Sequence, residues 1–510
     1  MRILTAIVPF LLLSPAFGQR QLQAHTLPQL WTVQKMRSAG DVNGDGHLDV
    51  VAIVHDNTPS ASPFAKLMVF SGLTGLPLYT IADQALLNAF DVLGIGDVNT
   101  DGRSDIVALT PIGQRLYSGA NGAFLNAAVP PANTSFVSGT GVGDYNGNGT
   151  ADLAIASHFS GNTTVRIVRG ENGAQLATLA TFPNPNTAAT VRAMGDVNGD
   201  GKSEVAISIP TGTVTVMHGA TGATLWSIAA TGNDNNRTID TLDLEGDGKR
   251  ELFFLRPDYS SSGANSLLTV HAATNGAVMI TVPGIVNGGL GRTIAGIGNV
   301  DDDNRTDFAI LTFLQGVRSV RAVSGANTRR LWVLPSWTSG GPKDPVVSVG
   351  DVDADGYGDF FVGASNWPLA DNDSLHLISG KVIAESQPQA GACGGGPFFP
   401  RLGVTRPILG QTVTIAGQDG PIGVPGLLTI SVQPAAPTWL GASSCYAFTN
   451  ITLLSVLATL SQPQWNLPLT LPLVPQLAGF EIALQSYYAP TIGPLGFDLS
   501  NGVWARLGYQ

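Results

Sequence analysis

The sequence predicts an all-β protein, a seven-bladed β-propeller followed by a small C-terminal domain resembling a β-sandwich. Three observations lead to this prediction. A nine-residue acidic motif occurs seven times, and a glycine-rich hairpin motif accompanies each copy. The chain of 510 residues also contains 62 glycines and 32 prolines, a composition that favours many short strands joined by tight turns. Because the two motifs count to the same number, we expect one of each per blade.

The acidic motif carries oxygen-bearing side chains at positions 1, 3, 5 and 9, and glycine at position 6 in six of the seven copies. Successive copies begin about 50 residues apart, which is the size of one four-stranded propeller blade. We call the copies loops 1 to 7, and they span residues 41–49, 97–105, 144–152, 196–204, 243–251, 299–307 and 351–359.

Alternate side chains of such a loop can converge on one hard cation, with the carbonyl of position 7 as a further ligand. Calcium, which takes six to eight oxygen ligands, fits this donor set better than the smaller, octahedral magnesium. The predicted ligands, loop by loop, are Asp41, Asn43, Asp45 and Asp49; Asp97, Asn99, Asp101 and Asp105; Asp144, Asn146, Asn148 and Asp152; Asp196, Asn198, Asp200 and Glu204; Asp243, Glu245, Asp247 and Glu251; Asn299, Asp301, Asp303 and Asp307; Asp351, Asp353, Asp355 and Asp359.

Two alternatives explain the loops less well. Aspartate, asparagine and glycine are common turn formers, so one copy alone could be a plain turn, but seven copies in one frame argue against coincidence. An EF-hand needs a carboxylate at position 12 and flanking helices. Position 12 is apolar in every copy, and it lies in apolar runs of four or five residues that predict strands covered on both faces. The position-12 residues are Ala52, Ala108, Ile155, Ile207, Phe254, Ile310 and Val362.

The second motif, a strand, a glycine-rich turn and a strand, recurs about 20 to 30 residues after the start of each loop. We therefore expect four strands per repeat, with the acidic loop between the first two. The copies span residues 69–75, 116–122, 167–173, 216–222, 270–276, 322–328 and 377–382, and the last is truncated.

Together, the loop and the Ser-Gly-x-x-Gly hairpin resemble the FG-GAP/VCBS repeats of integrin-α-type β-propellers, over roughly residues 31–383. The resemblance implies metal loops that brace the inner strands at one face of the propeller and ligands that meet loops at the opposite face. It carries metal ligation over to loops 1, 2, 4, 5 and 7. Loop 3 has Asn148 at position 5, and loop 6 has Asn299 at position 1 and Asn304 in place of glycine, so these two are expected to bind weakly or not at all.

The N-terminus has the pattern of a secretory signal peptide. Met1-Arg2 precedes an apolar run from Ile3 to Leu13 and a small-residue segment that ends at Gly18. The pattern predicts a signal peptide over residues 1–18, followed by an N-terminal lead over residues 19–30. The apolar run is too short to cross a bilayer, and no later run reaches about 18 to 20 apolar residues. We expect a secreted or cell-surface protein.

After the propeller, expected over residues 31–383, a glycine-rich linker is expected over 384–396 and a C-terminal β domain over 397–510. Segments 427–432 and 480–484 of this nearly uncharged region predict short strands, which favours a small β-sandwich. Parts of the region, at residues 391–394, 445, 477–479 and 500–502, resemble a C-terminal domain found on some secreted bacterial proteins. That resemblance implies either sorting or surface attachment, or a passive carbohydrate-binding or packing role.

The chain has two cysteines, Cys393 and Cys445. In an oxidising compartment they predict one disulfide, and two separately buried thiols are the alternative. Metal ligation by this pair is not expected, because no histidine follows His376.

The charge of the chain gathers in the loops. The net charge is −11, and more than half of the 37 acidic residues occupy predicted ligand positions. An acidic chain of this kind does not favour nucleic acid as a partner. Like charges gathered in one loop repel one another unless a cation is bound, so calcium is expected to have a structural role.

The sequence favours a binding module over an enzyme. Neither H-E-x-x-H nor G-x-S-x-G occurs, and the seven histidines are scattered. We expect an extracellular binding or adhesion module for an unidentified protein or glycan; the alternative is a polysaccharide-acting lyase or hydrolase built on a propeller. The candidate surface is formed by the longer loops 55–66, 256–266, 335–345 and 364–374. Their aromatic residues can stack on sugars or anchor a partner, or merely cap blade edges; they are Tyr259, Trp337 and Trp367.

Overall fold

The structure is a computed structural model, and it describes most of the chain after residue 20. The expected signal peptide, both cysteines and the three aromatic residues Tyr259, Trp337 and Trp367 lie outside the described residues. The described range is 21–509 without 59–63, 132, 184–188, 210–212, 230–237, 257–266, 284–287, 302, 315–316, 329, 335–341, 366–371, 382–384, 389–399, 422–423, 433–437, 440–445, 448–454, 457–463 and 490–497.

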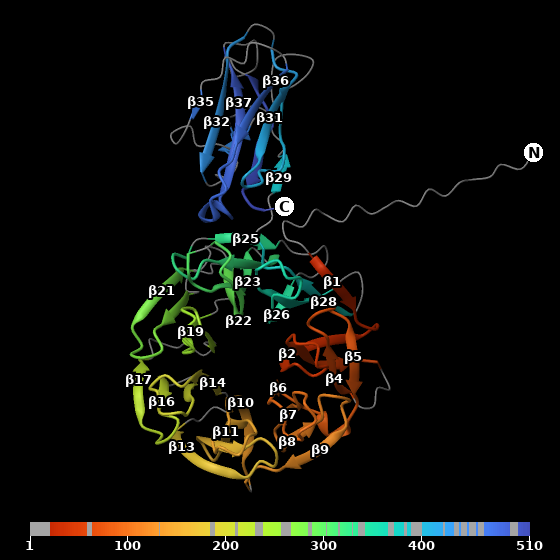
Figure 1. The fold of residues 1–510 in the computed structure, drawn as a ribbon, viewed down its shortest axis with the longest axis vertical. Helices are drawn as coiled ribbons and strands as arrows, with labels where there is room; N and C mark the ends of the chain where they lie inside the picture. Colours follow the sequence, from red (N-terminus) through yellow and green to blue (C-terminus); the bar gives the residue numbers. More distant parts are fainter. Residues whose placement is uncertain are drawn as a thin grey trace, which may run out of the picture.

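Seven four-stranded antiparallel sheets, numbered here like the loops, are found in the described part of residues 21–378, and they stand side by side around a ring (Figure 1). Sheets 1 to 3 consist of β2 Trp31–Gly40, β3 Asp49–Asp56, β4 Ala65–Phe70 and β5 Pro77–Ile81; β6 Asp91–Gly94, β7 Ile106–Thr110, β8 Gly113–Tyr117 and β9 Phe124–Ala128; β10 Ser135–Gly143, β11 Asp152–Phe159, β12 Asn162–Arg169 and β13 Gln175–Pro183.

Sheets 4 to 7 repeat the pattern. They consist of β14 Thr190–Gly195, β15 Glu204–Ser208, β16 Val214–Met217 and β17 Thr224–Ile228; β18 Thr238–Leu242, β19 Glu251–Arg256, β20 Leu267–His271 and β21 Val278–Pro283; β22 Gly288–Gly298, β23 Asp307–Leu314, β24 Val317–Val323 and β25 Arg330–Leu334; β26 Pro342–Gly350, β27 Asp359–Ser365, β28 Asp373–Ile378 and β1 Gln21–Thr26. The prediction of an all-β fold with repeated four-stranded sheets is therefore confirmed.

The first strands line the centre of the ring, and each contacts the first strand of the next sheet. The series runs β2, β6, β10, β14, β18, β22, β26, and β26 contacts β2 again. The second strands, which follow the acidic loops, are buried along almost their whole length, as their apolar runs predicted. Neighbouring sheets share apolar cores; Phe253 of β19 and Phe308 of β23, for example, meet edge to face with ring centroids 5.1 Å apart.

Sheet 7 is completed by the N-terminal strand β1. Residues Gln21 to Thr26 pair antiparallel with β28, from Ile378 back to Ser374. The sequence predicted that residues 19–30 form a lead before the propeller. In the structure, residues Gln21–Thr26 of this stretch form β1, which belongs to sheet 7. The seventh hairpin motif is truncated, and the next described strand, at Glu385–Pro388, pairs in the C-terminal part instead, so the edge of β28 is open to β1.

Side chains on fourth strands connect several sheets to the next hairpin. The Trp226 indole N–H donates to the carbonyl of Ala273 at 2.9 Å, and the Trp332 indole N–H donates to that of Gly380 at 3.0 Å. The Tyr79 hydroxyl donates in the same way to the carbonyl of Gly119. These polar ends of large, half-apolar side chains fix the hairpin turn against the preceding sheet.

The C-terminal part forms two facing sheets, as the predicted β-sandwich requires. Both expected strands are present, as β32 and β37. The larger sheet contains β29 Glu385–Pro388, β39 Val503–Arg506, β37 Glu481–Tyr488, β32 Gly426–Val432, β35 Ser455–Val456 and β38 Asp498–Leu499; the smaller contains β30 Arg401–Val404, β31 Thr412–Gln418 and β36 Trp465–Thr470; β33 Thr438–Trp439 pairs with β34 Tyr446–Ala447. Leu402 and Ile415 of the smaller sheet pack on Leu428 and Leu484 of the larger.

The sandwich packs on sheets 6 and 7, beside β25 in Figure 1. One apolar cluster includes Leu331 of β25 and Phe360 of β27 together with Leu409 and Leu507 of the sandwich. At its edge Arg330 forms an ion pair with Glu481. Helical turns in the described residues are limited to η1 Gln84–Leu86 and η2 Pro475–Leu477. A membrane-crossing helix, long and apolar enough for a bilayer, is not found in the described part of the chain.

Candidate metal-binding loops

Each acidic loop connects the first and second strands of its sheet, as predicted. Two of its residues have left-handed backbone conformations. Position 6 has φ between 82° and 92° where it is glycine, and Asn304 of loop 6 takes the same conformation at φ 70°. Position 4 is left-handed as well in the six loops where it is described, even where it is Thr100 or Ala354. Asparagine tolerates this region better than most residues, so Asn304 does not prevent loop 6 from closing.

The carboxylate at position 1 accepts hydrogen bonds from backbone amides within its own loop. In loop 4, Asp196 accepts N–H donors from Gly199 and Gly201, both at 2.8 Å. Asp144 of loop 3 is held in the same way by Gly147 and Gly149 at 2.7 Å. Hydrogen bonds from the position-6 amides, Gly149 and Gly201, lower the pKa of Asp144 and Asp196, so these two carboxylates favour the ionised form.

The carboxylate at position 9 is buried in all seven loops. Its residue is 0 to 3% exposed, and it accepts the amide N–H of position 2 at 2.6 to 3.0 Å. Burial raises the pKa of all seven, to about 7 for Glu251, Asp307 and Asp359. An ionised carboxylate here is therefore costly unless positive charge lies close by.

In six of the sheets, position 9 also accepts a hydrogen bond from the glycine of the hairpin motif. In sheet 1, the Gly72 amide donates to Asp49 at 2.9 Å. The glycines are Gly72, Gly119, Gly170, Gly219, Gly325 and Gly380. A Cβ atom on any of them would lie 1.7 to 2.2 Å from the carbonyl oxygen of loop position 8. Sheet 5 has Ala273 instead, and no such bond to Glu251 is found there among the described residues.

In four of the sheets, the residue before that glycine reaches position 5. Ser118, Ser324 and Ser379 donate their hydroxyls to Asp101, Asp303 and Asp355 at 3.3, 2.8 and 3.5 Å. In sheet 4 this residue is His218, whose Nε2 lies 3.4 Å from Asp200. Its Nδ1 accepts the Ala220 amide, so Nε2 carries the proton of the neutral ring and points it at Asp200. The contact between the residue before the hairpin glycine and loop position 5 was not predicted from the sequence. The recurring serine of the Ser-Gly pair was the feature that could have indicated it.

Two loops bring three carboxylates together. One oxygen each from Asp301, Asp303 and Asp307 of loop 6 lie within 4.8 Å of one another, and the same holds for Asp351, Asp353 and Asp359 of loop 7. Two oxygens on opposite sides of a calcium ion are about 4.6 to 5.2 Å apart, because each bond is about 2.3 to 2.6 Å. The donor sets of these loops therefore fit calcium in both chemistry and spacing. Loop 6 is one of the two that the sequence expected to bind weakly or not at all.

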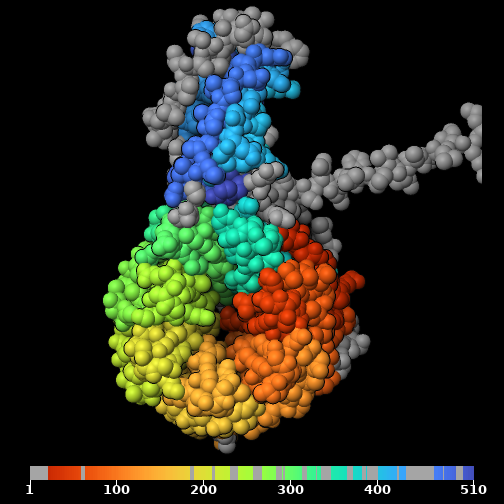
Figure 2. All heavy atoms as spheres, viewed as in Figure 1, coloured from red at the N-terminus to blue at the C-terminus, as the bar shows by residue number. Residues whose placement is uncertain are grey.

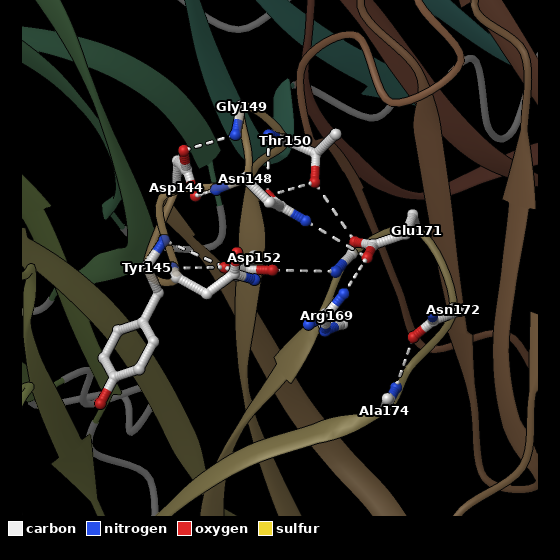
Figure 3. Close-up of polar contacts among 12 residues, drawn as sticks. Asp144, Tyr145, Asn148, Gly149, Thr150, Asp152, Arg169, Glu171, Asn172 and Ala174 are labelled. Carbon is white, nitrogen blue, oxygen red and sulfur yellow. Dashed lines mark hydrogen bonds and ion pairs between the residues drawn. The ribbon is translucent and has the colours of Figure 1, made fainter.

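Loop 3 is built differently (Figure 3). Asn148 stands at position 5, where its side-chain N–H donates to Glu171 at 3.4 Å, and Thr150 donates its hydroxyl to the same carboxylate at 3.3 Å. Arg169 pairs with Glu171 at 3.2 Å. Loop 3 lacks a carboxylate at position 5, and Glu171 of the hairpin places one beside that position. The guanidinium of Arg169 lies next to this carboxylate. Arg169 and Glu171 are the charged residues of the hairpin motif Ile167 to Gly173, and their charge was the feature of the sequence that could have indicated this contact.

The side chain of one predicted ligand, Glu245, contacts the neighbouring loop instead of its own loop. Glu245, at position 3 of loop 5, forms an ion pair at 2.8 Å with Arg305, at position 7 of loop 6. Both side chains are partly exposed. The pair connects neighbouring loops, so the side chain of Glu245 would have to leave Arg305 before it could join its own loop's cluster.

The ring of four-stranded sheets, with an acidic loop repeated in each sheet, defines a β-propeller protein of the binding or adhesion type. The sequence model of the FG-GAP-like repeat family matches residues 97–155 and 144–207. Residues 97–207 therefore contain FG-GAP-like repeats, as the resemblance of the motifs implied.

No curated protein matches the chain. Among solved structures, one similar chain is described as "Crystal structure of BBS1N in complex with ARL6DN, soaked with lead", with 12% sequence identity and a TM-score of 0.42. The match covers 72% of this chain and 94% of that one.

Proposed function

We propose that this protein is secreted, that its acidic loops bind calcium, and that the calcium-braced propeller serves as an extracellular binding or adhesion module for a protein or glycan. One observation carries the calcium proposal: every loop holds a buried position-9 carboxylate whose pKa is raised by burial. A divalent cation close to that carboxylate would favour its ionised form and offset the repulsion among the other loop carboxylates.

The proposed role of calcium is structural. Position 9 begins the second strand or, in sheet 2, directly precedes it. It accepts an amide of the loop and, in six sheets, an amide of the hairpin. An ion held by this carboxylate would hold three segments of one sheet together. Affinity per loop should be weak, on the order of 10⁻⁴ to 10⁻³ M, as in other extracellular modules.

Thermal unfolding of the full chain in calcium, in magnesium and in excess chelator tests this proposal. Because a ligand that binds only the folded state raises its melting temperature, we expect a clear fall in chelator and a smaller recovery with magnesium than with calcium. Asp353→Asn in loop 7 should reduce the gain from calcium. Asp419→Asn, which changes a carboxylate outside the loops, is the matched control. Equal melting temperatures in calcium and chelator would refute calcium binding.

Retention on glycan and protein arrays in calcium tests the binding role. A ligand should be retained by the folded protein in calcium and lost in chelator at a temperature above the melting temperature that chelator leaves. Turnover of an arrayed polysaccharide, instead of retention, would replace the binding proposal with a lyase or hydrolase. N-terminal sequencing of the protein from culture medium tests secretion, since cleavage after Gly18 is expected.

A further inference from the structure

A cavity of about 550 Å³ lies in the centre of the ring. Its walls are first strands of sheets 1, 2, 3, 4 and 5, and residues of loops 2 and 5 reach it as well. It therefore lies at the end of the central channel where the acidic loops are, and Figure 2 shows the hollow between the sheets. This volume is in the range of small-molecule binding sites.

The residues that line this cavity include three arginines, Arg37, Arg192 and Arg250, and one aspartate, Asp240; Lys35 and Asp91 lie next to Arg37. Asp91 is 2% exposed and is shared by two cations, Arg37 at 3.4 Å and Lys35 at 3.0 Å. Asp240 pairs with Arg192 at 3.2 Å. Arg250 lines the cavity and has no ion pair within the described part of the chain. The group thus carries more positive than negative charge.

Positive charges repel one another at this end of the channel, although Asp91 and Asp240, against the effect of burial, raise the pKa of Arg37. Burial lowers the pKa of Arg192, and the neighbouring charge of Arg37 lowers it further. Burial likewise lowers the pKa of Lys35 to about 8, and Arg37 and Arg192 add to the effect while Asp91 opposes it. An anion among these groups would relieve this repulsion, and guanidinium groups are well suited to hold anionic oxygens in a bidentate way.

The position of Arg250 follows from the fold. It stands at position 8 of loop 5, and its backbone amide donates to the carbonyl of Met194 in sheet 4 at 2.8 Å. Position 8 of a loop therefore crosses to the preceding sheet, toward the cavity. Gly141 of β10 keeps the opposite wall open, since a Cβ atom there would meet nothing within 4 Å.

We propose that this cavity binds a small acidic ligand, whose carboxylate, sulfate or phosphate oxygens are held by Arg37, Arg192 and Arg250. This inference does not rest on calcium, because none of the three arginines occupies a predicted metal-ligand position. It assigns a ligand to the loop end of the channel, whereas the resemblance of the repeats implied ligands at the opposite face.

Equilibrium dialysis of the full chain tests the proposal, with radiolabelled sulfate and glucuronate as separate probes, in calcium at constant ionic strength. We expect saturable binding of at least one probe at one site per chain. Sulfate alone would identify a tetrahedral oxyanion site and glucuronate alone a carboxylate site. Uncharged glucose should not compete.

Arg250→Gln should weaken the binding at least about tenfold, the effect of one charge-assisted hydrogen bond. Arg250 is exposed and lacks an ion pair, so this variant should fold. Gly141→Leu, which fills the open space, should abolish binding. Arg401→Gln is the matched control, because its side chain is 73% exposed on the sandwich. Absence of saturable binding, or equal binding by Arg250→Gln, Gly141→Leu and the unmodified chain, would overturn the proposal.

Discussion

The amide of Gly72 donates a hydrogen bond at 2.9 Å to the buried carboxylate of Asp49, and this bond connects the hairpin motif to the acidic loop of the same sheet. Five other sheets repeat it. The two sequence motifs therefore recur together for a structural reason: in six of the seven sheets, the carboxylate at loop position 9 accepts a hydrogen bond from the turn of the hairpin.

Gly72→Ala should destabilise the protein, because the new Cβ atom would lie 1.9 Å from the Leu48 carbonyl oxygen and the turn must move away from Asp49. We expect a loss of about 1 to 3 kcal/mol in the free energy of unfolding, measured by chemical denaturation in calcium. Gly403→Ala is the control, since nothing lies within 4 Å of its new Cβ atom. Equal stability of the two variants would contradict the close-packing argument.

The repeats made most of the fold predictable. Seven copies of two motifs gave the number of sheets, the order of strands and the place of each loop, because period and register are properties of the sequence itself. The strand β1 was not predictable in this way, since its partner β28 lies more than 340 residues away in the chain. Only the truncated seventh hairpin indicated that a strand was missing.

The loop sites were predictable in part. Spacing identified ligands within a loop, but Glu171 reaches loop 3 from the hairpin and Arg305 draws Glu245 toward the next loop. Such contacts depend on how separate segments pack, which the motif does not encode. The central cavity was missed for the same reason: Arg37, Arg192 and Arg250 share no motif and meet only when the ring forms.

Asn148→Asp should make loop 3 more dependent on calcium. The new carboxylate would face Glu171, which lies 3.4 Å from the Asn148 amide nitrogen, so repulsion should lower the melting temperature in chelator. Calcium should reverse this, and the melting difference between calcium and chelator should exceed that of the unmodified chain. Asn162→Asp, an exposed change outside the loops, controls for added charge. An unchanged difference for Asn148→Asp would show that loop 3 is not a latent calcium site.

Leu409→Ala should destabilise the junction between the sandwich and sheets 6 and 7. Leu409 is 4% exposed and belongs to the cluster that contains Leu331 and Phe360. Loss of this side chain should cost about 2 to 5 kcal/mol, observed as a lower melting temperature by calorimetry. Leu473→Ala on the same domain is the control, because Leu473 is 68% exposed. Equal melting of both variants would mean that the junction contributes little to stability.

Acidification should weaken the contact between β1 and β28 through His376. Its Nδ1 lies 2.8 Å from the Gln21 side-chain oxygen and its Nε2 lies 2.8 Å from the Ser374 hydroxyl. Burial lowers the pKa of His376 to about 4 from its usual value of 6.5.

The sign of the effect follows from this shift. The folded state binds the proton less readily than the unfolded state, so stability is complete above pH 6.5 and falls as the pH drops from 6.5 toward 4. His376→Gln should flatten this part of the curve of unfolding free energy against pH. Gln21→Glu should also reduce the loss, because a carboxylate beside the imidazole raises its pKa. If both variants follow the pH dependence of the unmodified chain, His376 does not govern the acid stability of sheet 7.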